Sequence, residues 1–191
     1  YINVDELRKM WQAESERVIN RWNQLRPDWP DEEIKLFGPS TASGTHSYFT
    51  DQIVGSNKTT RGDYAATEND EVLVLGVAES TYGLGIFGLA YYQENFYRLK
   101  LVPVDDEIPE NGDGAFQPTR ETIKNRQYQP LFRDLYLYVS DQSLKENRTK
   151  RFLNYYLENA GQFVQSVGYI PQPQSVYQSY LDKIAVQEPA E

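Results

Sequence analysis

Residues 37–49 read Phe37-Gly38-Pro39-Ser40-Thr41-Ala42-Ser43-Gly44-Thr45-His46-Ser47-Tyr48-Phe49. This stretch leads from a strand-like apolar run through small hydroxyl residues into a segment that can be helical. A Ser/Gly/Thr loop at a helix start presents unpaired backbone N–H groups at the positive end of the helix dipole, so an anion can bind without a lysine. Ser43 and Thr45 can donate from their hydroxyls, and Gly44 permits close approach to the backbone. The alternative interpretation is an ordinary helix N-cap without a ligand.

The composition is that of a folded protein with one core or two small lobes. The chain has 191 residues, of which 39% are hydrophobic, and a net charge of −9. Such a charge repels nucleic acid and anionic lipid, so we expect neither as a partner, and an anion site has to work through short hydrogen bonds. The sequence holds no run of about eighteen apolar residues, so we expect no membrane insertion.

Cysteine and histidine usage argues against metal chemistry. There is no cysteine, and His46 is the single histidine, so we expect no thiolate or histidine-based metal site. We also expect no cofactor. The chain begins at Tyr1 without a visible signal peptide, which we interpret as a piece excised from a longer protein.

Capping signals and apolar spacing predict helices and strands in alternation. The expected helices cover residues 4–14, 46–54, 68–78, 90–97, 119–125, 148–160 and 173–184. The expected strands cover residues 34–37, 84–87, 99–104 and 131–139, and the last has the strongest pattern. Residues 105–117 are expected to form a solvated loop. The alternation favours an α/β fold with a mixed sheet flanked by helices.

Residues 83–88 (Gly-Leu-Gly-Ile-Phe-Gly) match the dinucleotide-binding pattern G-x-G-x-x-G, with Asp105 and Asp106 downstream. One hypothesis is therefore a nucleotide- or NAD-dependent enzyme. Ile86 and Phe87 are bulky where the pyrophosphate needs room, so glycines flanking a close-packed strand are the simpler explanation.

A catalytic serine is a further alternative. Ser43 lacks the glycine two positions earlier that the hydrolase pattern G-x-S-x-G requires. His46 is three residues away, but no third member of a triad is identifiable, and we expect no catalytic residue. A third hypothesis is a non-catalytic interaction domain in which Ser43 and Thr45 only cap a helix.

Arg61 is the candidate basic residue for an anion site. Its planar guanidinium offers two donors that match two oxygens of a tetrahedral oxyanion, and Asp63 could hold that fork in place. The alternative interpretation is a solvated loop residue.

The segment strand–Gly-Pro-x-Thr-x-Ser-Gly-Thr–helix resembles the periplasmic phosphate-binding proteins of bacterial ABC transporters. The run from Arg61 to Val74 resembles them as well, and residues 83–92 are similar to the cyanobacterial subgroup. Trp22-Asn23, residues 128–131 and the two closing helices extend the resemblance over most of the chain.

The resemblance implies a periplasmic-binding-protein-like (type II) fold and a non-enzymatic protein that closes over inorganic phosphate and delivers it to an ABC transporter permease in the periplasm. The family's phosphate ligands correspond to Ser43, Gly44 and Thr45. The family arginine four residues before the serine is Pro39 here, which leaves Arg61 as its candidate replacement. The family aspartate two residues before the serine is Thr41, which we include as a candidate ligand.

The resemblance also implies a division into lobes. Residues 1–130 are expected to form the second, ligand-binding lobe, and residues 131–191 a crossover strand and helices that return towards the first lobe. Most of that first lobe precedes the equivalent of Tyr1 in the family. We therefore expect this chain to bind phosphate weakly, and its uncovered apolar surface to drive dimerisation.

Overall fold

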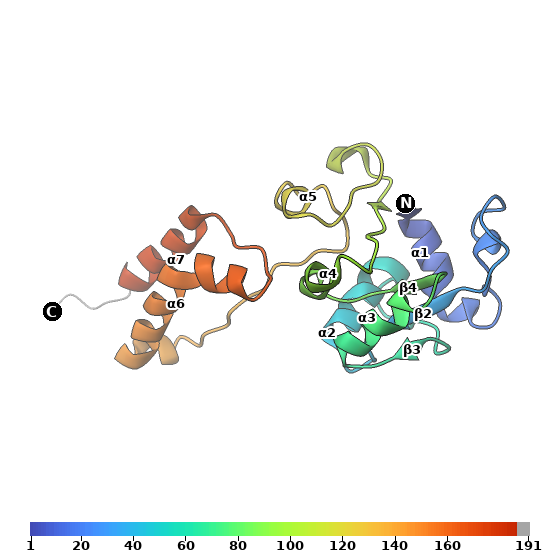
Figure 1. Cartoon of the computed structure of the whole chain (residues 1–191). Helices are drawn as coiled ribbons and strands as arrows, with labels where there is room; N and C mark the ends of the chain where they lie inside the picture. The colour runs from blue at the N-terminus through green and yellow to red at the C-terminus, as the bar shows by residue number, and fades with distance from the viewer. Residues whose placement is uncertain (187–191) are drawn as a thin grey trace. The chain divides into compact units, whose positions relative to one another are not determined.

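The computed structural model describes residues 1–186, which form two compact units. The first unit is Tyr1–Phe132, and the second begins at Arg133. Figure 1 shows the course of the chain through both units. Each unit is described by itself.

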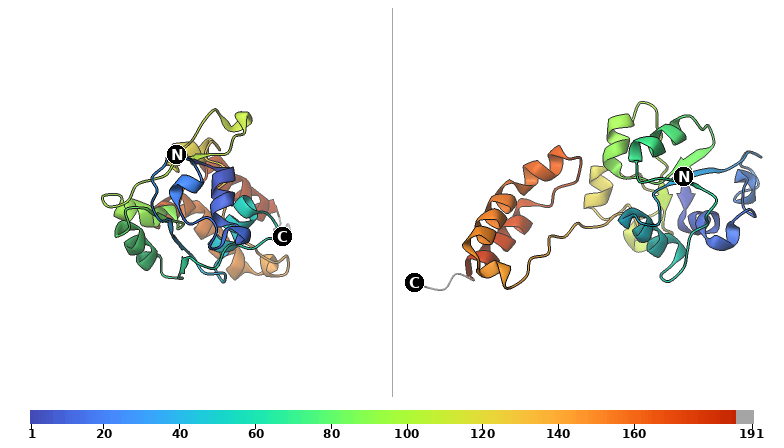
Figure 2. Two further views of the ribbon diagram at one scale, coloured as in Figure 1. Left: turned by 90° about the vertical axis from the view of Figure 1, so that its right-hand side faces the viewer. Right: turned by 90° about the horizontal axis from the view of Figure 1, so that it is seen from below.

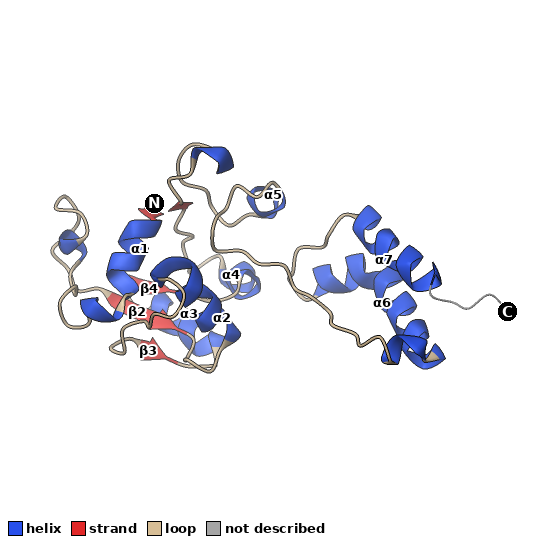
Figure 3. Ribbon diagram, turned by 180° about the vertical axis from the view of Figure 1, so that it is seen from behind, coloured by secondary structure: helices blue, strands red, loops and turns tan. Residues whose placement is uncertain are grey.

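A three-stranded parallel sheet organises the first unit. Strand β2 (Lys35–Gly38) is central, with β3 (Ala65–Ala66) and β4 (Gly83–Gly85) on its two sides. A helix follows each strand: α2 (Gly44–Phe49), α3 (Asp70–Ala78) and α4 (Leu89–Asn95). Figure 3 shows these strands among the helices, and the predicted α/β class is confirmed. Because the strands are parallel, the loops that follow them open at the same edge of the sheet.

Helix α1 (Val4–Trp11) anchors α2 to the core. It begins with a capping box between Asn3 and Glu6, and a 3-10 turn at Ala13–Ser15 replaces the end of the helix predicted over residues 4–14. Trp11 is buried and contacts Phe49 of α2 edge-on, with ring centroids 5.3 Å apart. A π-helical turn, Thr50–Val54, continues α2 and also packs on the core.

The strand predicted over residues 99–104 is wrong except at its end. Only β5 (Val104–Asp105) forms, and it pairs in parallel with β1 (Ile2–Asn3). The preceding apolar residues have no strand beside them within the described chain, so they remain irregular. The helix α5 (Arg120–Lys124) follows the predicted acidic loop, which holds a 3-10 turn at Pro109–Asn111.

The second unit is a helical hairpin. Helices α6 (Asn147–Ser166) and α7 (Gln174–Val186) pack against each other, and Figure 2 shows them side by side. The helix α6 runs past Gly161, where the prediction ended it, and Gly168 follows its end with a φ of 81°. No helix among residues 1–186 combines the length and apolarity needed to cross a bilayer.

The strand predicted over residues 131–139 is also wrong. Leu135, Tyr136, Leu137 and Tyr138 are 56–88% exposed and belong to no strand. A segment with strand-like composition forms a strand only where a neighbouring strand supplies backbone hydrogen-bond partners. Among the described residues no strand lies beside residues 131–139.

Candidate functional site

Ser43 forms the N-cap of α2. Its Oγ accepts a hydrogen bond from the Thr45 N–H at 3.1 Å, and its own N–H donates to the Ser40 carbonyl at 3.0 Å. The helix begins at Gly44, two residues earlier than predicted, as the Ser-Gly-Thr chemistry favours. No hydrogen bond found among residues 1–186 uses the hydroxyl proton of Ser43 or that of Thr45, so both can donate to an anion.

Three loops meet at the carboxyl edge of the sheet. They follow β2, β3 and β4 and cover residues 39–43, 67–69 and 86–88. The Ser40 N–H donates to the Glu68 carboxylate at 3.1 Å, the Ser40 hydroxyl donates to the same oxygen, and the Thr67 N–H donates to the Gly38 carbonyl at 3.2 Å. In open α/β sheets ligands bind at this edge, so the predicted ligands lie where the fold favours a site.

Tyr64 and His46 stabilise the loop of residues 39–43, which follows β2. The Tyr64 hydroxyl donates to the Pro39 carbonyl at 2.9 Å, and its ring stacks on His46. The His46 Nε2 lies 2.9 Å from the Thr60 hydroxyl. Burial lowers the pKa of His46, and the nearby Glu68 carboxylate partly opposes this effect. His46 stabilises the loop through its contacts with Tyr64 and Thr60.

Arg61 occupies a different place from the one expected. It is 5% exposed, and its Nη1 donates to the carbonyls of Met10 and Ile19 at 3.0 and 2.7 Å. Its Nε and Nη2 donate to the two oxygens of Asp63 at 2.5 and 2.9 Å, which confirms that Asp63 holds the fork. Four of the five N–H groups are therefore used within the protein, and in this arrangement Arg61 does not present its fork to an anion.

Thr41 lies in the turn before Ser43 and is exposed. Its backbone belongs to the loop that Glu68 and Tyr64 hold through Ser40 and Pro39. Its position leaves its hydroxyl open to solvent, next to the start of α2.

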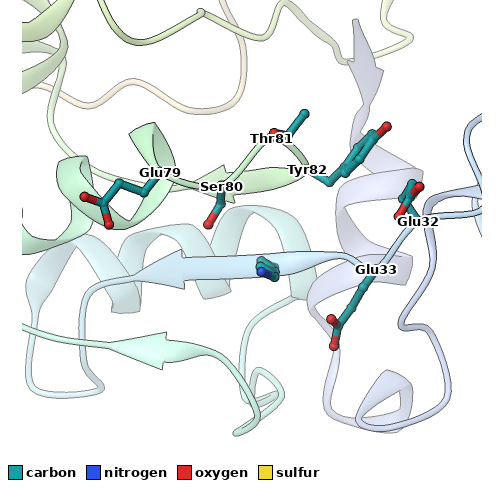
Figure 4. Close-up of a pocket in the computed structure, with 7 residues that line it drawn as sticks. Glu32, Glu33, Glu79, Ser80, Thr81 and Tyr82 are labelled. Carbon is teal, nitrogen blue, oxygen red and sulfur yellow. The ribbon is translucent and has the colours of Figure 1, made fainter.

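One hollow lies at the opposite end of the sheet. It has a volume of about 320 Å³, and Figure 4 shows Glu32 and Glu33 from the loop before β2, with Glu79 from the end of α3, around it. Three carboxylates beside a single lysine, Lys35, disfavour an anion there.

The second hollow lies beside the loop that follows β3. It has a volume of about 500 Å³ and is lined by Glu68, Asn69, Asp70, Glu71 and Tyr91. Burial raises the pKa of Asp70, and the neighbouring Glu68 adds to this while a hydrogen bond from Tyr91 opposes it. Neither of these two hollows is lined by Ser43, Gly44 or Thr45, of which Gly44 is exposed and the other two are half-buried. Within residues 1–186 no cluster of three or more His, Asp or Glu side chains is arranged to hold a metal ion.

Gly83 and Gly85 have packing roles. A Cβ on Gly83 would lie 2.8 Å from the Ser80 Cβ, and one on Gly85 would lie 2.4 Å from the Val77 Cγ2. Such distances are below van der Waals contact, so these two strand positions favour glycine. Close packing therefore explains the first two glycines of the G-x-G-x-x-G pattern without a nucleotide, whereas Gly88 has room for a Cβ.

The model of the PBP superfamily domain matches residues 2–160. The chain belongs to this superfamily. Among other members, it is 42% identical over 177 residues to the protein SphX of Synechocystis, and 31% identical over 183 residues to the phosphate-binding protein PstS of Staphylococcus haemolyticus. These alignments cover 92% and 94% of this chain.

A solved structure shares the same PBP-superfamily fold. The crystal structure of a possible phosphate binding protein from Planctomyces limnophilus superposes with a TM-score of 0.83 at 40% identity, covering 96% of this chain and 63% of that one. The predicted periplasmic-binding-protein-like fold is thereby confirmed. The chain spans about half the length of the curated relatives it matches, 51% of SphX and 54% of PstS.

Proposed function

We propose that this chain is the phosphate-capturing part of the solute-binding protein of a phosphate ABC transporter. The observation that carries the proposal is the position of Ser43-Gly44-Thr45 at the start of α2, directly after a central strand of a PBP-superfamily fold. The names of PstS and of the Planctomyces protein supply the ligand class, and both are similar to this chain. PstS is named as a phosphate-binding protein and the Planctomyces protein as a possible one, which supports a non-enzymatic role.

The proposed ligands are Ser43, Gly44 and Thr45, and Thr41 can add a fourth hydroxyl. Phosphate is strongly hydrated, and each oxygen left without a donor on binding costs about 1–3 kcal/mol. The hydroxyls of Ser43 and Thr45 replace some of those water contacts, and the helix dipole favours the negative charge. Arg61 is left out of this ligand set, because its donors stabilise the fold instead.

Residues 1–130 act in this proposal as the ligand-binding lobe, and residues 131–191 as the segment that returns to the other lobe. The relatives are about twice as long as this chain, so further residues complete the cage in a whole protein of their length. The chain alone binds phosphate weakly, since water reaches the open loop.

The partners and the location follow from the same proposal. The whole protein works in the periplasm and delivers phosphate to an ABC transporter permease. The large exposed side chains of the second unit, among them Leu135, Tyr138 and Phe152, drive dimerisation of this chain in isolation.

A phosphate titration of the ¹⁵N-labelled chain followed by NMR tests the proposal, because it detects weak binding residue by residue. We expect phosphate, but not chloride at equal ionic strength, to shift the amide signals of Gly44 and Thr45. The double variant Ser43→Ala/Thr45→Val should lose the response, whereas Ser47→Ala, an exposed serine on the same helix, should keep it.

Other outcomes favour the alternatives. Shifts at residues 83–88 with NAD and none with phosphate would support a nucleotide-dependent enzyme. A response to neither ligand would leave an interaction domain in which Ser43 only caps a helix.

A further inference from the structure

Tyr48 joins α2 to the last residues of the first unit. Its hydroxyl lies 2.7 Å from the Pro130 carbonyl oxygen and is also hydrogen-bonded to the Phe132 carbonyl oxygen. A phenol has one proton, so the two carbonyls share it as acceptors. Phe132 ends the first compact unit, and Arg133 begins the second.

The position of Tyr48 on α2 places it on the same face as the proposed ligands. It follows Gly44 by four residues and Thr45 by three, the spacings that bring helical side chains together. Helical side chains lean towards the N-terminus, so the Tyr48 ring extends along the turn that starts the helix. The first turn of α2 and the backbone of residues 130–132 are therefore linked through one side chain.

Residues 128–132 are the last anchored part of the first unit. Tyr128 is 8% exposed and donates its N–H to the Thr122 carbonyl at 3.1 Å, and Leu131 and Phe132 pack against the core. Burial raises the pKa of Tyr128, and the adjacent Tyr48 adds to this effect. The exposed residues 135–138 begin only three positions after Phe132. The Tyr48 hydroxyl therefore contacts the last residues of this segment that pack against the core.

Packing of helix α2 allows a restraint at its first turn to affect the rest of the helix. Phe49, Ile53 and Val54 are buried at its end and in the π-helical turn, so the helix responds as one packed element. An anion that binds the hydroxyls of Ser43 and Thr45 restrains the first turn of α2, and the Tyr48 phenol restrains the carbonyls of Pro130 and Phe132 in turn.

We propose that Tyr48 is a positioning residue that couples anion capture at the start of α2 to the backbone of residues 130–132, where the segment between the two units begins. This inference rests on the proposed function, because it takes inorganic phosphate as the anion.

Hydrogen exchange measured by mass spectrometry on the 191-residue chain tests the coupling, with phosphate at high millimolar concentration and chloride at equal ionic strength. In the unaltered chain we expect phosphate to slow exchange at residues 44–47 and also at residues 131–134. The second effect should be about fivefold, at the lower end of typical coupling between sites. In Tyr48→Phe, phosphate should slow exchange only at residues 44–47.

Thr50→Val is the matched control. It removes a hydroxyl that also donates to a backbone carbonyl in the same unit, that of His46, but has no hydrogen bond to residues 130–132. At saturating phosphate, Thr50→Val should keep the slowed exchange at residues 131–134.

Each other outcome overturns the inference in a recognisable way. If residues 131–134 respond equally in Tyr48→Phe, or do not respond in the unaltered chain, the coupling is refuted while phosphate capture stands. If residues 44–47 show no response in the unaltered chain, the proposed function fails and the coupling fails with it.

Discussion

The guanidinium of Arg61 and the carboxylate of Asp63 form a bidentate ion pair at the point where the chain returns to the sheet as β3, with N–O distances of 2.5 and 2.9 Å. The remaining Nη1 of Arg61 links this pair to the carbonyls of Met10 and Ile19. A side chain that residue type alone suggests for anion binding thus cross-links two segments of the core.

Asp63→Asn should destabilise the first unit by about 3 kcal/mol, because it leaves the buried Arg61 charge without its counter-ion. Urea unfolding followed by tryptophan fluorescence measures the change. The control is Asp31→Asn, whose partner Arg21 is exposed and whose removal should cost no more than about 1 kcal/mol. Equal effects from the two variants would contradict the structural role of Arg61.

The same pair predicts a pH dependence of stability. The hydrogen bond from Arg61 holds the pKa of Asp63 below its ordinary value, against an opposing effect of burial. The stabilisation is therefore present above the unfolded-state pKa of about 3.9, and is lost as the pH falls through the lower folded-state pKa. The free energy of unfolding measured from pH 7 to about pH 3 should fall less steeply in Asp63→Asn. If the free energy of unfolding fell equally steeply in both proteins at low pH, other carboxylates would control the acid dependence.

Gly85→Ala should destabilise the first unit by about 1–3 kcal/mol, because the added Cβ would overlap Val77 and Phe87. Gly88→Ala is the matched control from the same glycine-rich run. Its Cβ would meet the Tyr91 ring at an ordinary 3.6 Å, so its effect should stay within about 0.5 kcal/mol. Thermal unfolding of both variants measures how much each added Cβ destabilises the unit. Similar melting temperatures would argue against the packing explanation for Gly85.

Glu68→Gln should strengthen phosphate binding about fivefold, since it removes a negative charge hydrogen-bonded to the loop that starts α2. The amide oxygen of glutamine can still accept from the Ser40 N–H, so the loop keeps its position. The NMR titration described above gives the dissociation constant. Glu79→Gln, at the opposite end of the sheet, should leave it unchanged, and a weaker affinity in Glu68→Gln would mean that the carboxylate is needed by the ligand.

Sequence reasoning succeeded where the deciding chemistry is local. Asn3 and Ser43 cap the helices predicted near residues 4 and 46, because an N-cap bond joins groups only two or three residues apart. The Ser-Gly-Thr loop was located in the same way, at the end of the central strand.

The errors concern features that depend on distant partners. The runs 99–104 and 131–139 have strand-like composition, but pairing depends on a neighbouring strand that composition does not reveal. The buried position of Arg61 has no sequence signal for a related reason: the carbonyls of Met10 and Ile19 that accept its hydrogen bonds are 51 and 42 residues away in sequence. The contact of Tyr48 with residues 130 and 132, more than 80 positions away, had no sequence signal.

The amino-acid sequence by itself determined the helix starts, the glycine positions of β4 and the donor-rich loop at residues 43–45, since these follow from bonding between near neighbours and from side-chain size. Only the tertiary structure decided which apolar runs pair as strands, which charges are buried and which loops share the carboxyl edge of the sheet. Those outcomes depend on contacts across long loops, whose formation depends on the packing of the whole chain rather than on local preference.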